Sequence, residues 1–170
     1  MIDPNVMYTT DDMVFFWQSP APFGQWTAAK FVVDRITYNC AEQFMMAEKA
    51  RLFGDEEMWV LIMSTQNPAE QKRLGRHVDG FDDALWKAHR EDIVFRGNMA
   101  KFTQNPALLD ALLDTGDRLL VEASPYDRIW GIGLHSTDER AADPAQWRGQ
   151  NLLGNVLMRV RLTLRQAQRP

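Results

Sequence analysis

The sequence predicts an α+β fold, mostly helical, with a few short strands in a single compact domain over residues 1–170. Three observations lead to this prediction. Helical periodicity dominates the chain after about residue 40, the β-prone runs are short, and no repeat, low-complexity stretch or linker divides the sequence. A chain of this length buries roughly 70% of its unfolded surface without a disulfide or metal. We expect the core of the domain to span about residues 14–165.

Short strands are predicted before the first helix. Residues 1–12 have no clear periodicity and are expected to form a loose lead-in. Two β-prone runs follow, Val14–Trp17 and Lys30–Val33, separated by a loop that contains proline and glycine. A tight turn at Asp34-Arg35 then leads into Ile36–Tyr38. We expect these runs to form one small β-element ahead of the first helix.

Helices account for most of the remaining chain. They are expected at about 40–53, at about 55–64 with Trp59, Ile62 and Met63 facing inward, from Pro68, at about 82–102 behind an Asp82 N-cap, from Asn105-Pro106 to a C-cap at Gly116, and at about 151–166. Between the last two helices, Arg118–Ala123 is the clearest strand candidate. The closing helix carries its apolar residues along one side, so that side is predicted to pack against the core.

Composition excludes several classes of protein. A net charge of −4 argues against non-specific nucleic-acid binding, although a single base or nucleotide in a pocket stays compatible with it. The single cysteine, Cys40, excludes an internal disulfide and is expected to pack as a small apolar residue. The three histidines lack metal-ligand spacing, so we expect no metal and no cofactor. With no signal-like segment and no long apolar run, we expect a cytoplasmic protein that does not enter membranes.

The first helix carries the most informative residues. At 100° per residue, Glu42, Met45, Met46 and Lys49 share one face. Glu42 and Lys49 lie roughly 10 Å apart along the axis, which is too far for a direct salt bridge. Two charges on an apolar face cost free energy unless something polar lies between them, and a small ligand meets that requirement. The alternative is a capping box in which Glu42 bonds back to Asn39, and the helix alone does not decide between the two.

Three further segments carry candidate residues. Asp127 and Trp130 follow the predicted strand in a loop whose glycines, Gly131 and Gly133, allow close approach of the backbone to a ligand. An Asx turn and a core tryptophan are the structural alternatives. Asn151 stands at a helix start, where it either contributes to an anion site or simply caps the helix. Gln25-Trp26 in the early loop shows no mechanism by spacing alone.

Taken together, these segments resemble the NADAR family, which is also called YbiA-like. The resemblance rests on Tyr-x-x-x-Glu42-Gln-Phe-x-x-Ala-x-Lys49, Leu74-Gly-Arg76, Trp86, Lys101-Phe102, the stretch Glu122–Gly133, and Trp147-x-Gly-x-Asn151-x-Leu-Gly154. It covers about residues 14–165 in order. This chain departs from the commoner sequence motifs of the family at two places. It has Glu-Gln-Phe in place of Glu-His-Tyr, and Phe-Gly-Gln-Trp26 in place of Leu-Ser-Asn-Phe.

The resemblance implies N-glycosidase activity, the hydrolysis of a bond between ribose C1′ and nitrogen. It implies as substrate a phosphorylated riboside, namely a ribosylamino-pyrimidine intermediate of riboflavin synthesis, or an ADP-ribosylated base. It also implies catalytic roles for Glu42 and Asp127, with Trp86 and Trp130 holding the base or ribose. We expect Lys49, Gln25, Trp26 and Asn151 to contribute to substrate binding.

The predicted residue types suit this chemistry. Departure of a base from C1′ develops oxocarbenium character, which one carboxylate stabilises while a second positions water or protonates the leaving group. Glu42 between apolar neighbours is expected to have a raised pKa, and Asp127 in a polar turn is expected to stay ionised. Lys49 or Arg128 is available for a phosphate. The alternative function is a module that binds ADP-ribose or a nucleotide without turning it over.

Overall fold

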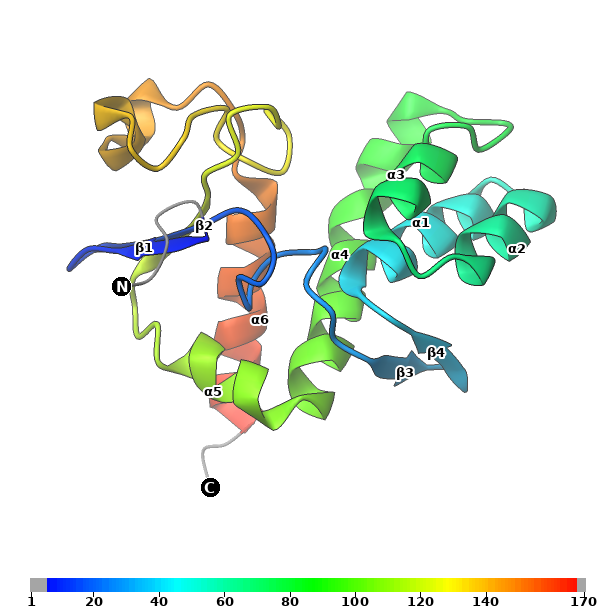
Figure 1. Cartoon of the computed structure of the whole chain (residues 1–170), viewed down its shortest axis with the longest axis horizontal. Coiled ribbons are helices and arrows are strands. Elements are labelled where there is room, and N and C mark those ends of the chain that lie inside the picture. The colour runs from blue at the N-terminus through cyan, green and yellow to red at the C-terminus, as the bar shows by residue number, and fades with distance from the viewer. Residues whose placement is uncertain (1–5, 168–170) are drawn as a thin grey trace. The chain divides into compact units, whose positions relative to one another are not determined.

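The computed structural model describes residues 6–167, and contacts between Cα atoms divide the chain into two compact units. The first unit holds the residues up to Thr27 together with those from Ala107 onward, and the second holds Ala28–Pro106. Within the described residues there are six α-helices and five short strands in two sheets (Figure 1). The predicted α+β, mostly helical fold class is therefore confirmed.

The second unit is a group of four helices preceded by a β-hairpin. Its elements are β3 (Phe31–Val33), β4 (Ile36–Tyr38), α1 (Ala41–Leu52), α2 (Glu56–Ser64), α3 (Pro68–Gly75) and α4 (Asp83–Gln104). α1 contacts each of α2, α3 and α4, so it is the central helix of this unit (Figure 1). Three helices begin where the sequence supplies a capping side chain, because Asp55, Asn67 and Asp82 each accept a backbone N–H of the first turn.

The hairpin is held against α1 and α4. Asp34 and Arg35, both with positive φ, form its two-residue turn as predicted. The ring of Tyr38 lies 5.0 Å from that of Phe44 on α1, centroid to centroid. At the open edge, the side-chain amide of Gln104 accepts from the N–H of Val32 and donates to its carbonyl, both at 2.8 Å. The start of α1 is thereby fixed in position.

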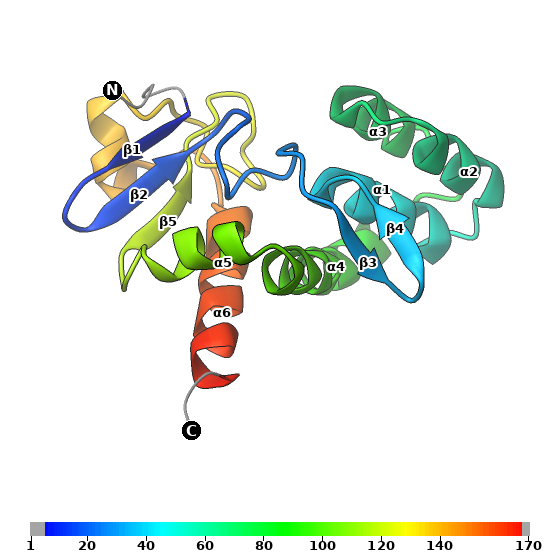
Figure 2. The ribbon, with the colours of Figure 1, turned by 60° about the horizontal axis from the view of Figure 1, so that its bottom comes forward.

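The first unit is built on a three-stranded sheet. β1 (Met7–Thr9) pairs antiparallel with β2 (Met13–Phe16), and β2 pairs parallel with β5 (Leu119–Glu122), as Figure 2 shows. The chain reaches β5 through α5 (Pro106–Leu113). Beyond β5 come two 3-10 turns, η1 (Glu139–Ala142) and η2 (Pro144–Gln146), and the closing helix α6 (Leu152–Ala167).

α6 covers the sheet with the apolar side that the sequence predicts. The buried residues of this side are Leu153, Val156, Leu157, Val160 and Leu164. The buried guanidinium of Arg161 donates to Thr115 Oγ1 at 2.7 Å and to the Arg118 carbonyl at 3.0 Å, which ties α6 to the turn before β5. Arg161 thereby joins α6 to the segment that leads into β5.

Several sequence predictions are corrected. The lead-in contains the strand β1 over Met7–Thr9, a run too short to show a period, whereas residues 1–5 lie outside the described part. The expected single β-element is divided, because β2 pairs with the distant β5 and leaves β3 and β4 as a separate hairpin. In α2 only Ile62 is buried. The single-domain organisation stays a prediction.

Candidate active site

Glu42 lies in the first turn of α1 with 5% of its surface exposed. The N-cap of this helix is Cys40, which makes no side-chain capping bond. The backbone N–H of Asn39 donates to Oε1 of Gln43 at 2.8 Å. The capping box between Asn39 and Glu42, one of the two alternatives, is therefore wrong, because Gln43 is the side chain that reaches back. The alternative, in which Glu42 faces a ligand, stays a prediction.

Lys49 lies two turns further along α1 and contacts both α3 and α4. Its Nζ donates to the carbonyl of Gly75 at 2.7 Å. The same atom lies 4.5 Å from the ring centroid of Phe81 and 5.4 Å from that of Trp86. Burial lowers the pKa of Lys49, and the positive charge of Arg76 lowers it further. The structure thus brings together two of the predicted residues, Lys49 and Trp86.

Lys101 is a buried ionisable residue that the sequence reasoning did not select as a site residue. Its side chain is fully buried in α4, and this desolvation lowers the pKa of Lys101 to about 7. Nearby, burial raises the pKa of Cys40 to about 11, the charge of Glu42 raises it further, and that of Lys101 opposes the rise. Cys40 is thus a buried neutral thiol beside two ionisable groups. A sequence signal for Lys101 existed, because it continues the buried stripe of Val94 and Asn98.

Asp127 forms the Asx turn that was its structural alternative. Its Oδ1 accepts from the N–H groups of Ile129 and Trp130, both at 2.8 Å. Its own N–H donates to Ser124 Oγ at 3.2 Å. Two backbone N–H groups thus hold the Asp127 carboxylate through one oxygen. The turn also fixes Trp130 three residues away.

The loop after β5 is hydrogen-bonded to the segment that opens α6. The N–H groups of Arg148, Asn151 and Leu153 donate to the carbonyls of Ile132, Gly131 and Trp130 at 2.9, 3.1 and 3.1 Å. A Cβ on Gly149 would lie 2.3 Å from the Gly131 carbonyl oxygen. The close backbone approach predicted for this loop is therefore an approach to the protein's own chain.

Asn151 occupies a buried position with φ of +52° just before α6. Its Oδ1 accepts from the N–H of Glu122 at 3.0 Å, and its Nδ2 donates to the carbonyl of Leu120 at 2.9 Å. The side chain thus pairs with β5 as an additional strand residue would. A Cβ on Gly154 would lie 2.0 Å from the same Leu120 oxygen. These contacts explain the Asn and Gly of the motif structurally.

The remaining predicted residues also belong to the first unit. Gln25 is half-buried, and Trp26 is 41% exposed in the loop that follows β2. At the end of the same strand, the ring of Trp17 lies 5.9 Å from that of Tyr126 and 5.6 Å from that of His135. Aromatic side chains therefore gather beside the turn of Asp127, including one, Trp17, that was not predicted.

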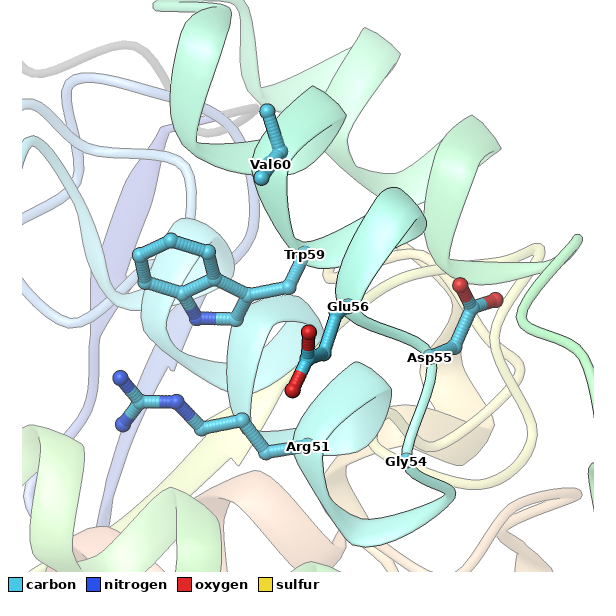
Figure 3. Close-up of a pocket in the computed structure, with 6 residues that line it drawn as sticks. All are labelled: Arg51, Gly54, Asp55, Glu56, Trp59 and Val60. Carbon is cyan, nitrogen blue, oxygen red and sulfur yellow. The ribbon is translucent and has the colours of Figure 1, made fainter.

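Two cavities lie away from these residues. One of about 420 Å³ is lined by Arg51, Gly54, Asp55, Glu56, Trp59 and Val60. In Figure 3 the side chains of Arg51, Glu56 and Trp59 converge, and the Arg51 guanidinium lies 5.1 Å from the Trp59 ring centroid. Arg51 is opposite Glu42 around α1 at 100° per residue. The other cavity, of about 360 Å³, is lined by residues of β1, β2 and the 136–142 segment.

The described residues offer no metal centre. Over residues 6–167, no three His, Cys, Asp or Glu side chains gather closely enough to hold an ion. In that same part of the chain, none of the helices has the length and apolar character needed to cross a membrane. His77 and His89 are exposed and His135 is half-buried.

Comparison with known proteins identifies relatives over most of the chain. The model of the NADAR domain matches residues 15–165. N-glycosidase R617 of Acanthamoeba polyphaga mimivirus is 44% identical over 144 residues, which are 82% of this chain and 85% of that protein. The maize protein named riboflavin biosynthesis protein PYRR, chloroplastic, is 27% identical, over 94% of this chain but 26% of its own length.

A solved structure shows the same relationship to this family. The NMR structure of the Escherichia coli protein YbiA superposes with a TM-score of 0.75 at 26% identity, covering 96% of this chain and 92% of that one. By sequence, the N-glycosidase YbiA of E. coli is 28% identical over 154 residues, 89% of this chain and 88% of that protein. Because the family model spans nearly the whole sequence, the chain belongs to the NADAR domain family.

Proposed function

We propose that this protein hydrolyses the C1′–N bond of phosphorylated ribosides, either ribosylamino-pyrimidine intermediates of riboflavin synthesis or ADP-ribosylated bases. The coarser statement rests on its relatives: the chain is a hydrolase of N-glycosidic bonds, as are the named N-glycosidases that match it over most of both lengths. The riboflavin branch is supported by the name of the maize relative. Phosphorylated ribosides do not cross membranes unaided, so we also propose a cytoplasmic location.

The buried carboxylate of Glu42 is the observation that carries this proposal. Glu42 lies in the first turn of α1 and is only 5% exposed, whereas the side chain that bonds to the Asn39 N–H is that of the neighbouring Gln43. A carboxylate that is withdrawn from water is a candidate for chemistry. Beside C1′ it would stabilise the positive charge that develops as the base departs.

Asp127 is proposed as the second carboxylate. Its Oδ1 is fixed by two backbone N–H groups, so the carboxylate is held in one orientation before any substrate binds. As an ionised group, its role would be to position the attacking water and to add to the stabilisation of the developing positive charge. The ammonium of Lys101, with a pKa of about 7, is a further group able to exchange a proton near neutral pH.

The test is a product assay with two substrates. Purified protein is incubated with a ribosylamino-pyrimidine 5′-phosphate or with ADP-ribosylated guanosine, and free ribose 5-phosphate or ADP-ribose is measured. We expect multiple turnovers with one of them and a loss of at least a hundredfold in Glu42→Gln. Tight binding of the same compounds without any product would instead identify a module that binds ADP-ribose or a nucleotide.

A further inference from the structure

A cluster of two cations and three aromatic rings lies where α1, α3 and α4 meet. The Lys49 ammonium donates to the carbonyl of Gly75 at the end of α3, and Arg76 is the next residue. Phe81 and Trp86 lie against the ammonium at 4.5 and 5.4 Å, and the ring of Phe53 lies 5.4 Å from that of Phe81. We call these five residues (Phe53, Phe81, Trp86, Lys49 and Arg76) the cationic corner.

The two cations of the cationic corner lack a carboxylate partner. Across residues 6–167, neither Lys49 nor Arg76 forms an ion pair. Cations nearby on α3 and α4 do have carboxylate partners: Arg73 pairs with Glu70 at 2.7 Å, and Lys87 pairs with Asp83 at 2.6 Å. The charge of Arg76 is close enough to lower the pKa of Lys49, so the two repel each other. An anion between them would relieve that repulsion.

Close packing of α3 on α1 builds this arrangement. A Cβ on Gly75 would lie 2.0 Å from Sδ of Met46, so a larger residue here would require the buried Met46 side chain to move. This close packing brings the Gly75 carbonyl within reach of Lys49. The ammonium is therefore held in one place by a hydrogen bond and two rings, and its flexible stem loses little further entropy when it binds a ligand.

The rings determine which kind of anion suits the cationic corner. Phe81 is 47% exposed, so an apolar surface borders the two cations. A bare inorganic ion would gain nothing from this surface, whereas a phosphoryl group attached to a sugar would cover it. Lys49 also lies on the face of α1 that carries Glu42, at an axial separation of roughly 10 Å. A riboside with its C1′ toward Glu42 would direct its 5′ end toward Lys49.

We propose that Lys49 and Arg76 together bind the phosphoryl group on O5′ of the substrate. This inference rests on the proposed function and assigns the residues that hold one end of its substrate. It also selects Lys49 over Arg128 as the phosphate ligand, and it gives Trp86 the role of holding Lys49. The shared chemistry is a phosphoryl group, supplied either by a ribose 5-phosphate or by the diphosphate of ADP-ribose.

The kinetic test compares a riboside substrate with and without its 5′-phosphate. Arg76→Gln and Lys49→Met should each raise KM for the phosphorylated substrate about ten- to a hundredfold, as expected for loss of a hydrogen bond between charged groups. The loss of kcat/KM should be much smaller for the unphosphorylated substrate, so the ratio of the two kcat/KM values is the readout. Arg73→Gln and Lys87→Met remove equal charge from paired positions on α3 and α4, and should leave both substrates unaffected.

A binding measurement separates this inference from the proposed function. Calorimetric titration with ribose 5-phosphate and with ADP-ribose does not require turnover, and Arg76→Gln should weaken at least one of them about tenfold or more. If the wild-type protein hydrolyses neither riboside yet loses this binding in Arg76→Gln, the proposed function fails and the phosphoryl site stands. The inference is overturned if Arg76→Gln binds both compounds normally and Lys49→Met lowers the melting temperature without weakening binding. Lys49 would then only cap the end of α3.

Discussion

The side-chain oxygen of Gln43 accepts a hydrogen bond from the backbone N–H of Asn39 at 2.8 Å, just before the start of α1. The amide nitrogen of Gln43 donates to the carbonyls of Ile62 and Thr65 at 3.3 and 3.2 Å. Gln43 therefore joins the start of α1 to the end of α2. The side chain that holds the start of α1 in place is therefore that of Gln43, next to the buried Glu42.

Glu42→Gln should lower kcat by about two to four orders of magnitude and change the melting temperature little. Glutamine has nearly the same shape, and its neutral amide removes only the charge and the ability to exchange a proton. Product release in a steady-state assay and a thermal melt of the same preparation check both parts.

The matched control is the next residue. Gln43→Ala should lower the melting temperature because three hydrogen bonds are lost, while the folded fraction keeps its kcat. If Glu42→Gln melts several degrees lower and retains full activity, Glu42 is a structural residue and the assignment is withdrawn.

Asp127→Asn should lower kcat far more than it changes KM. The asparagine Oδ1 still accepts from Ile129 and Trp130, so the turn is kept while the negative charge is lost. A charge that matters as the oxocarbenium character develops affects the transition state more than the bound substrate. Normal turnover in this variant would remove Asp127 from the mechanism.

Asp127→Ala serves as the comparison. It removes the acceptor of two N–H groups and should destabilise the first unit by about 1–3 kcal/mol. Trp130 would lose its fixed position along with the turn. We therefore expect KM to rise in Asp127→Ala but not in Asp127→Asn, a difference that separates the charge from the turn.

Asn151→Ala should destabilise the protein strongly, and any loss of activity should follow from unfolding. The change leaves the Glu122 N–H and the Leu120 carbonyl without their partner and places alanine at φ of +52°, so we expect a cost of about 2–4 kcal/mol. Asn151→Asp, which keeps the acceptor, should cost less. If Asn151→Ala melts normally but binds substrate poorly, Asn151 is a ligand residue as the sequence suggested.

Local patterns predicted the helices and missed the pairing of the strands. The starts of α2, α3 and α4 follow from Asp55, Asn67 and Asp82, whose side chains accept backbone N–H groups two or three residues further along the chain. The pairing of Phe16 with Glu122 instead joins two strands that lie more than a hundred residues apart in the sequence. No local period encodes such a pairing, so β2 was grouped with the nearer hairpin.

The candidate site residues also show that local spacing does not predict contacts between separate elements. Glu42 and Lys49 were placed on one face by helical spacing alone, and their side chains do belong to buried or half-buried positions of α1. The roles of Gln43 and Gly75 depend on the neighbouring helices, which spacing cannot supply. Lys101 was overlooked because a lysine on a helix is normally solvated, and only its stripe of buried neighbours shows that this one is not.

The buried Lys101 should make stability increase with pH between about 7 and 9. Its pKa is lowered from 10.5 to about 7 in the folded protein, so between these values the unfolded chain binds the extra proton and folding is penalised as pH falls. The penalty is full below pH 7 and disappears toward 10.5. Cys40, with its pKa raised from 9.0 to about 11, acts in the opposite direction above pH 9.

Lys101→Met should therefore be more stable than the wild-type protein at pH 7, with an advantage that shrinks as pH rises to 9. The variant keeps an unbranched chain of similar length in the same buried space and removes the titrating group. Urea unfolding of both proteins at pH 7, 8 and 9 gives the difference in free energy at each pH. Lys87→Met, at an exposed and paired position, should show no such trend. A constant difference between wild type and Lys101→Met across this range would mean that Lys101 is charged in the folded protein.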